Sequence, residues 1–374
     1  MTGARLLAGA LVFGGAAVAA AAAPTDPTLV WRIHEPALGV PAADSETVYA
    51  LTLNHELVAA RIADGRIRWR VPLDSTSPTF GSRVILRGDI VVAGDYDLMG
   101  IDKRTGQVRW IYAPADNGGA GLLLGDASGN LVFTGSLTGY VRAVDVRTGR
   151  ARWQHQVGPS GGDVTVYHPV FGGNRVAASY TAWDSPSHGG VVVIDRRSGR
   201  LLWQKPVPGS IGNAGRPAIA LGRVFVPSRD GSIHVFHINT GESIGTIPPV
   251  PTQAGEQDYR PLVVTSGALI AGSLSGDVYA YDLRSRLVRW RRPSDLYSVL
   301  FEMIASDEVV YLPIGTREIL ALRAEDGREI GRFGSTDESI LWAPFVTGRH
   351  LFASGTSTLT HFTINPVARK GARP

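Results

Sequence analysis

The sequence predicts an all-β fold, an eight-bladed β-propeller built from four-stranded antiparallel blades. A turn ending in Thr-Gly, or in a substitute for it, recurs along the chain and is followed in most copies by a tryptophan four residues later. The turn positions are 65, 106, 149, 199, 241, 286 and 327, so successive copies lie 41 to 50 residues apart. A period of this length, made of short β-runs, is typical of propeller blades.

The copies of this motif differ in whether they keep the turn glycine and the tryptophan. Both are present in Ala63–Trp69, Arg104–Trp110, Arg147–Trp153 and Arg197–Trp203; the glycine is absent from Arg284–Trp290, and the tryptophan from Asn239–Gly245 and Glu325–Gly331. An indole ring can pack on a neighbouring blade while its N–H finds a backbone acceptor. We therefore expect these tryptophans to be structural.

One repeat illustrates the four strands that we expect in each blade. From the axis outwards they are Leu122–Leu124, Leu131–Thr134, Val141–Asp145 and Ala151–His155. Their small, aliphatic and β-branched residues suit sheets that pack on neighbouring blades with both faces. Counting by second strands gives eight blades, which start near Val48, Ile90, Leu131, Val176, Val224, Leu269, Val309 and Leu351.

The two ends of the repeat region complete each other. The last blade runs through Leu351–Ala353 and Leu359–Thr363 without a following outer strand, whereas residues 28–33 form an outer strand with no blade before them. We expect residues 28–33 to complete the eighth blade and close the ring, which removes exposed sheet edges. Residues 365–374 are predicted to be a basic tail.

Composition restricts the function classes. The 374 residues are 44% hydrophobic and 19% charged, as in globular proteins, and we expect residues 24–364 to form one domain. The net charge of +4 is spread along the chain, so we expect no nucleic-acid partner and at most a mild, peripheral attraction to anionic membrane surfaces. The chain has no cysteine, which excludes disulfides, thiolate metal sites, cysteine nucleophiles and a lipidated N-terminal cysteine.

The N-terminus has the features of an export signal. Arg5 precedes an apolar stretch, Leu6–Ala23, whose terminal alanines fit cleavage near Ala23. We expect residues 1–23 to be a signal peptide and the mature protein to be periplasmic or secreted. An uncleaved N-terminal membrane anchor is the alternative, since 18 apolar residues can just span a bilayer.

The run Val141–Asp145, followed by Thr148, Gly149 and Trp153, resembles the repeat of the pyrroloquinoline-quinone-like propeller family, and the resemblance covers about residues 28–364. One branch of that family, the quinoprotein alcohol dehydrogenases, holds the quinone and a calcium ion on the propeller axis, typically beside a disulfide that this chain lacks. The chain resembles more the other branch, the B subunit of the outer-membrane β-barrel assembly machinery. That branch is exported, non-enzymatic and docks partners through surface loops, but its members are normally lipoproteins.

The mouth of the axial channel is the predicted binding surface, because the loops that enter the innermost strands converge there. Three such loops place a polar residue before proline, at His168, Arg216 and Arg260, where proline favours extended geometry. The other predicted site residues are Tyr167, Asn213, Asp258, Tyr259, Tyr297, Glu302 and Trp342. Together they predict a cationic, aromatic-lined mouth for an anionic group or an acidic peptide. The alternative is that they only cap contacts between blades.

An insertion, Tyr180–Gly190, explains the 50-residue spacing between two turns. Trp183, with Asp184 and His188 beside it, is predicted to anchor a protein partner, since aromatic residues are enriched in binding hot spots. The alternative is that the indole folds back on its own blade.

Patterns of catalytic residues are missing from the sequence. His55-Glu56 lacks the second histidine of a zinc helix, and the nine histidines are scattered without metal-ligand spacing. We expect no catalytic residues, no metal and no cofactor, and predict a monomeric binding scaffold for an envelope or extracellular protein. The alternatives are an oxidoreductase that holds pyrroloquinoline quinone and calcium, or another small molecule, in the axial pocket, and a solute-binding sensor module.

Overall fold

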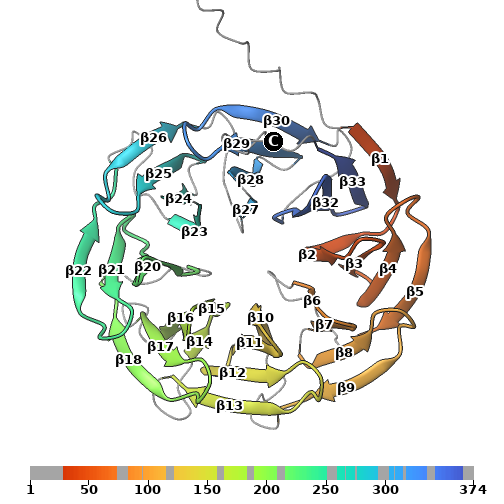
Figure 1. The fold of residues 1–374 in the computed structure, drawn as a ribbon, viewed down its shortest axis with the longest axis horizontal. Coiled ribbons are helices and arrows are strands. Elements are labelled where there is room, and N and C mark those ends of the chain that lie inside the picture. Colours follow the sequence, from red (N-terminus) through yellow and green to blue (C-terminus); the bar gives the residue numbers. More distant parts are fainter. Residues whose placement is uncertain are drawn as a thin grey trace, which may run out of the picture.

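The computed structural model describes residues 28–364 except 74–82, 95, 115–121, 158–163, 183–188, 209–214, 251–258, 266, 274–275, 294–302, 307, 315–316 and 335–341. Within these ranges the chain forms eight antiparallel sheets and no helix, and hence no helix that could cross a membrane. The sheets stand as blades in a ring around a central axis (Figure 1). The predicted eight-bladed propeller is confirmed.

Each blade is a meander whose strands run from the axis to the periphery. Blade 1 contains β2 (Ala37–Ala43), β3 (Thr47–Thr52), β4 (Glu56–Arg61) and β5 (Ile67–Pro72). Blade 2 contains β6 (Ile85–Arg87), β7 (Ile90–Gly94), β8 (Leu98–Asp102) and β9 (Val108–Tyr112). Blade 3 contains β10 (Leu122–Ser128), β11 (Leu131–Ser136), β12 (Tyr140–Asp145) and β13 (Ala151–Gln156).

Blade 4 contains β14 (Val164–Val166) and β15 (Val170–Gly172), both paired with β16 (Arg175–Ala182), then β17 (Gly190–Asp195) and β18 (Leu201–Pro206). Blade 5 contains β19 (Ala218–Ala220), β20 (Arg223–Pro227), β21 (Ile233–His237) and β22 (Ser243–Ile247). Blade 6 contains β23 (Tyr259–Val264), β24 (Ala268–Ser273), β25 (Val278–Asp282) and β26 (Val288–Arg292). Blade 7 contains β27 (Ile304–Ser306), β28 (Val309–Ile314), β29 (Glu318–Arg323) and β30 (Glu329–Gly334).

Blade 8 is assembled from both ends of the repeat region. It contains β31 (Phe345–Thr347), β32 (His350–Ser354) and β33 (Leu359–Thr363), and β1 (Thr28–Ile33) supplies its outer strand. The antiparallel register runs from Thr28 opposite Thr363 to Ile33 opposite Leu359. Figure 1 shows β1 and β33 side by side. The predicted closure of the ring by the N-terminal strand is confirmed.

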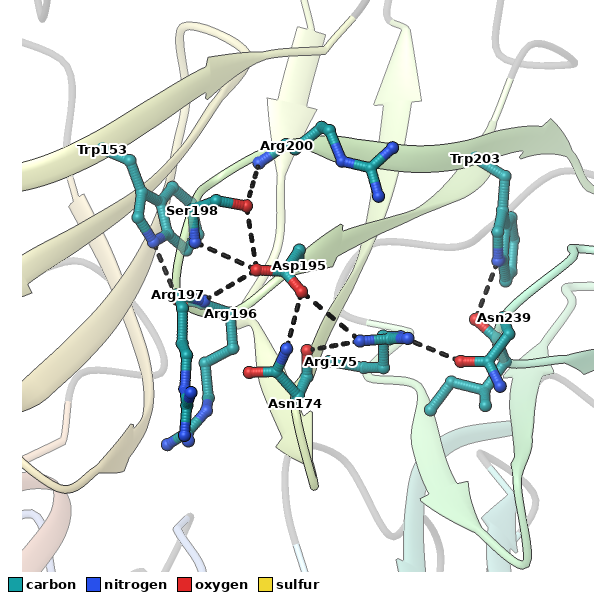
Figure 2. A network of polar contacts seen from close by, with 11 residues as sticks. Trp153, Asn174, Arg175, Asp195, Arg196, Arg197, Ser198, Arg200, Trp203 and Asn239 are labelled. Carbon is teal, nitrogen blue, oxygen red and sulfur yellow. Dashed lines mark hydrogen bonds and ion pairs between the residues drawn. The ribbon is translucent and has the colours of Figure 1, made fainter.

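An aspartate at the end of the third strand organises the turn before the outer strand. In blade 4, Asp195 Oδ1 accepts hydrogen bonds from the backbone N–H groups of Arg197 and Ser198 at 3.1 and 3.0 Å. Asp195 Oδ2 accepts from Asn174 at 2.6 Å and Arg175 at 3.5 Å, which belong to the turn between β15 and β16 and the start of β16 (Figure 2). Hydrogen bonds, that from the Ser198 backbone first, lower the pKa of Asp195, so this turn keeps its anion.

Each outer-strand tryptophan joins its blade to the turn of the next blade. The Trp110 indole donates to the carbonyl of Val146 at 2.7 Å, and a Cβ at Gly149 would lie only 2.6 Å from its ring. Gly149 also has a φ of +67°, so this position needs glycine for two reasons. The same bond joins Trp31, Trp69, Trp153, Trp203 and Trp290 to the carbonyls of Ile62, Lys103, Arg196, Ile238 and Ala324. The predicted structural role of the tryptophans is confirmed.

The junction between blades 5 and 6 replaces both partners of this contact. Gly245 stands where other outer strands carry tryptophan, and Arg286 stands where the next turn carries glycine. The Arg286 guanidinium donates to the carbonyl of Ile244 at 2.9 Å and lies 2.8 Å from where a Cβ of Gly245 would be. Arg286 thus occupies the place of the missing indole, although its φ of +63° is unusual for a residue other than glycine. The missing tryptophan of Asn239–Gly245 and the missing glycine of Arg284–Trp290 therefore compensate each other at one contact between blades.

The closing blade holds a pair of neighbouring histidines, of which His361 is buried and His350 is half-buried. His350 Nδ1 and His361 Nε2 lie 2.9 Å apart, and the Trp31 ring lies 5.1 Å from the ring of His361. His361 is 2% exposed. Burial, together with the nearby His350, lowers the pKa of His361 to about 4, so both the strand pairing and the packing of Trp31 depend on a neutral ring.

Replacing Gly149 by alanine is expected to lower the free energy of unfolding by about 3 kcal/mol, because left-handed backbone strain adds to overpacking against Trp110. Gly129→Ala is the matched control: its φ is +59°, but no atom lies within 4 Å of the added Cβ. The control should cost only about 1 kcal/mol of backbone strain. Urea unfolding of both variants checks this, and equal losses would contradict the contact.

A double-mutant cycle at the exchanged junction is expected to reverse the sign of one substitution. Arg286→Gly should lower the free energy of unfolding in the natural background, because it leaves a void beside Gly245. In a Gly245→Trp background the same substitution should raise it, because the indole then needs the glycine. The coupling should be at least about 1 kcal/mol in unfolding experiments, and additive effects would disprove the exchange.

Acid is expected to destabilise the ring through His361. The folded chain holds its pKa near 4, below the ordinary 6.5, so the unfolded chain takes up the proton first as the pH falls. The contribution of His361 to the free energy of unfolding should be fully present above pH 6.5, decrease as the pH falls below this value and be lost near pH 4. The total loss should be about 3 kcal/mol. In His361→Phe, which cannot titrate, unfolding midpoints should change less over this window. An unchanged pH dependence would assign the effect to other groups.

Candidate functional site

The innermost strands are irregular where the predicted polar residues lie. In blade 4, Tyr167, His168 and Pro169 separate β14 from β15. In blade 3, the register of β10 against β11 shifts between Leu124 and Ala127. Such bulges release residues from the ladder and redirect their side chains. Figure 1 shows β6, β10 and β15 among the strands nearest the axis.

Asp126, in the irregular part of β10, connects four consecutive blades. Its Oδ1 accepts from Arg83 of blade 2 at 3.4 Å and from Arg216 of blade 5, and its Oδ2 lies 3.4 Å from the N–H of Phe171 in blade 4. We call Arg83, Asp126 and Arg216 the axial triad. All three side chains are at most a quarter exposed, so their attraction is screened less than that of a surface pair. Two guanidinium groups thus share one carboxylate.

His168 and Tyr167 are built into the contact between blades 3 and 4. Both are buried. His168 Nδ1 lies 3.1 Å from the carbonyl of Leu124 in β10. Because a carbonyl only accepts, Nδ1 donates the proton in this contact. The Tyr167 N–H donates to the carbonyl of Ser179 at 2.9 Å.

Trp342 is also packed inside the ring. It is 3% exposed and belongs to a core cluster with Leu38, Tyr49 and Val84, from blades 1 and 2. Within the described residues its indole N–H has no hydrogen-bond partner. Its position links the segment before β31 to the first two blades rather than to the axial triad.

The remaining predicted site residues are not placed by the structure. Asn213, Asp258, Tyr297 and Glu302, and Trp183, Asp184 and His188 of the insertion, lie outside the described residues. The backbones of Tyr259 and Arg260 begin β23, but their side chains are not described. Among the described residues no three His, Asp or Glu side chains gather in a way that could hold a metal ion.

Sequence reasoning missed Arg83 and Asp126. A signal for Arg83 exists, because Arg83 and Arg216 both stand two residues before an inner strand, at Ile85 and Ala218. Asp126 carries no such signal, because the irregular segment of blade 4, Tyr167–Pro169, has no acidic residue with which it could be matched. Arg216, which the sequence predicted as a ligand contact, is placed in an ion pair between blades.

Comparison with known proteins assigns the family. A family model described as "Outer membrane protein assembly factor BamB" matches residues 15–185, 137–296 and 187–333. The chain belongs to this family. A BamB of Xanthomonas campestris pv. campestris is 28% identical over 98 residues, and the match spans 24% of this chain and only 24% of that curated relative.

Solved structures show the same fold at low identity. BamB from Moraxella catarrhalis superposes with a TM-score of 0.68 at 19% identity, covering 92% of this chain and 100% of that chain. Quinohemoprotein alcohol dehydrogenase from Comamonas testosteroni gives 0.70 at 13% identity, covering 92% and 77%. The predicted resemblance to the BamB branch is confirmed by the family match, whereas the similarity to the dehydrogenase is one of fold.

Removing the charge of the axial triad is expected to loosen the inner ring of this BamB-family propeller. Asp126→Asn keeps the shape but leaves Arg83 and Arg216 without their shared anion, which should lower the free energy of unfolding by about 2 kcal/mol. Asp89→Asn is the control, because that carboxylate is 70% exposed where it pairs with Arg109. It should change stability by less than about 0.5 kcal/mol. Equal effects would mean that Asp126 does not join the blades.

Proposed function

We propose that this propeller is an exported, non-enzymatic scaffold that holds protein partners of outer-membrane assembly in the cell envelope. The observation that carries the proposal is the family match, which extends over residues 15–333. The partner surface we propose is the axial mouth together with the insertion between β16 and β17. Arg260 would recognise an anionic group of the partner, and Trp183, with Asp184 and His188, would anchor it.

The ring suits such a role because its parts are rigidly connected. Tryptophan contacts join successive blades, β1 closes the ring, and the axial triad ties blades 2, 3 and 5 together. A surface held in place before binding loses less conformational entropy when a partner docks.

The proposal predicts that two substitutions weaken partner capture without destabilising the fold. In a pull-down of the tagged full chain from cell envelopes, Trp183→Ala should reduce the captured β-barrel assembly proteins at least tenfold, the usual scale of a hot-spot aromatic. Arg260→Ala should weaken capture less and in a salt-dependent manner. Leu137→Ala is the control, because Leu137 is exposed in the turn between β11 and β12 of the neighbouring blade.

The melting temperature of each variant decides how the result is interpreted. If capture and melting temperature fall together for Trp183→Ala, this residue belongs to the fold and not to the interface. A native mass spectrum of the purified protein tests the enzymatic alternative. A co-purifying quinone or calcium ion would move the assignment to an oxidoreductase that uses the axial pocket.

A further inference from the structure

The turns between first and second strands and between third and outer strands lie at one face of the ring, which we call the turn face. Asn174, in the first kind of turn, bonds Asp195 of the second kind at 2.6 Å. The contacts continue between blades: Arg175 Nε bonds Asn239 of blade 5 at 3.0 Å, and Arg196 bonds Ser128 of blade 3. Figure 2 shows the bonds of Asn174 and Arg175 to Asp195, and that of Arg175 to Asn239 of blade 5.

Charge is unevenly distributed over the turn face. The turns of blades 3 and 4 (128–130, 145–150, 172–175 and 195–200) contain six arginines and two aspartates. The turns of blades 1 and 7 (43–47, 61–66, 308–309 and 323–328) contain four arginines and six carboxylates. One sector of this face is therefore cationic, and the sector across the ring is acidic.

In the cationic sector four arginines are exposed, whereas the two aspartates are hydrogen-bonded within the turns. Asp145 is buried and accepts hydrogen bonds from its own turn and from Arg152 at 2.9 Å. Asp195 is engaged in the same way. The exposed arginines of these two turns are Arg147, Arg150, Arg197 and Arg200. Solvent and any partner thus meet guanidinium groups with little opposing charge.

A strained, exposed leucine stands beside this sector. Leu221, in the turn between β19 and β20 of blade 5, is 56% exposed and has a φ of +48°. Equivalent turns carry glycine at Gly88, Gly129, Gly173 and Gly348, with φ between +55° and +60° and no atom within 4 Å of an added Cβ. Glycine would suit the backbone of this turn, and the leucine side chain is more than half exposed. Residues kept in a strained conformation often mark a functional position.

We propose that the turn face of blades 3 to 5 docks on a bilayer surface that contains anionic phospholipids. Guanidinium groups bind phosphate through paired, charge-assisted hydrogen bonds, and arginines near an anionic leaflet attract it additively. A single leucine at a turn tip inserts at the boundary between headgroups and acyl chains. An array of exposed arginines beside one apolar tip fits a continuous sheet of phosphates better than it fits the mixed surface of a folded protein.

Vesicle co-sedimentation tests this proposal with a matched pair of variants. Arg150 and Arg200 directly follow the turn glycines of blades 3 and 4, and Arg66 and Arg328 occupy the same position in blades 1 and 7. With vesicles of phosphatidylethanolamine and phosphatidylglycerol, Arg150→Gln/Arg200→Gln should weaken binding about 25-fold, at about fivefold per arginine. Arg66→Gln/Arg328→Gln should change it less than about twofold, because those arginines lie in the acidic sector. All variants keep the natural N-terminus.

Leu221→Gly separates binding from folding. It should raise the melting temperature, because glycine relaxes the left-handed turn, and yet weaken vesicle binding several-fold. Vesicles of phosphatidylcholine alone should bind poorly, and salt should release the protein from the anionic ones. Equal binding to both vesicle types, equal losses in the two double variants, or loss of an acidic protein partner without any loss of lipid binding would overturn the proposal.

Discussion

The contact between an outer-strand tryptophan and the turn of the next blade is the interaction on which the ring depends. It combines a hydrogen bond to a backbone carbonyl with an indole face laid on a glycine that has no Cβ. Closure uses the same contact. Trp31, carried by β1, bonds the carbonyl of Ile62 at 2.6 Å and covers Gly65 of blade 1. The seam between the two chain ends is therefore joined like an ordinary boundary between blades.

This contact also explains why the fold was predictable from sequence. Its glycine and tryptophan are four residues apart in the four repeats that keep both, so each of those blades carries a local mark of its contacts with both neighbours. Period, strand order and the role of residues 28–33 follow from those marks. The exchange at Gly245 and Arg286 could not be predicted in this way, because its two residues lie 41 positions apart and each copy of the motif alone has simply lost one conserved position. Only the guanidinium placed beside Gly245 shows that they compensate each other.

The candidate site was much less predictable, for a related reason. The proline after His168 coincides with the break between β14 and β15, but the partners of such residues are determined by the curvature of the ring. Arg216 meets Asp126, 90 residues earlier and two blades away. No spacing rule gives that pair. Arg216, which the sequence predicts to meet a ligand, pairs with a carboxylate of another blade.

The turn face shows how one motif can serve both folding and recognition. In blades 2, 3, 4 and 6 an aspartate ends the third strand and accepts hydrogen bonds from the N–H groups of its own turn. For Asp195 these bonds, that from the Ser198 backbone first, lower the pKa. The positions around the aspartate only need to be polar, so their charge is free to differ between blades. In blades 3 and 4 they are arginines, and in blades 1 and 7 carboxylates are more frequent. In blades 3 and 4 these aspartates are engaged within their own turns, so the charge that this sector presents is set by exposed arginines at positions that the fold does not constrain. An uneven charge on an otherwise repetitive ring, together with a leucine where the backbone favours glycine, therefore indicates a requirement other than stability.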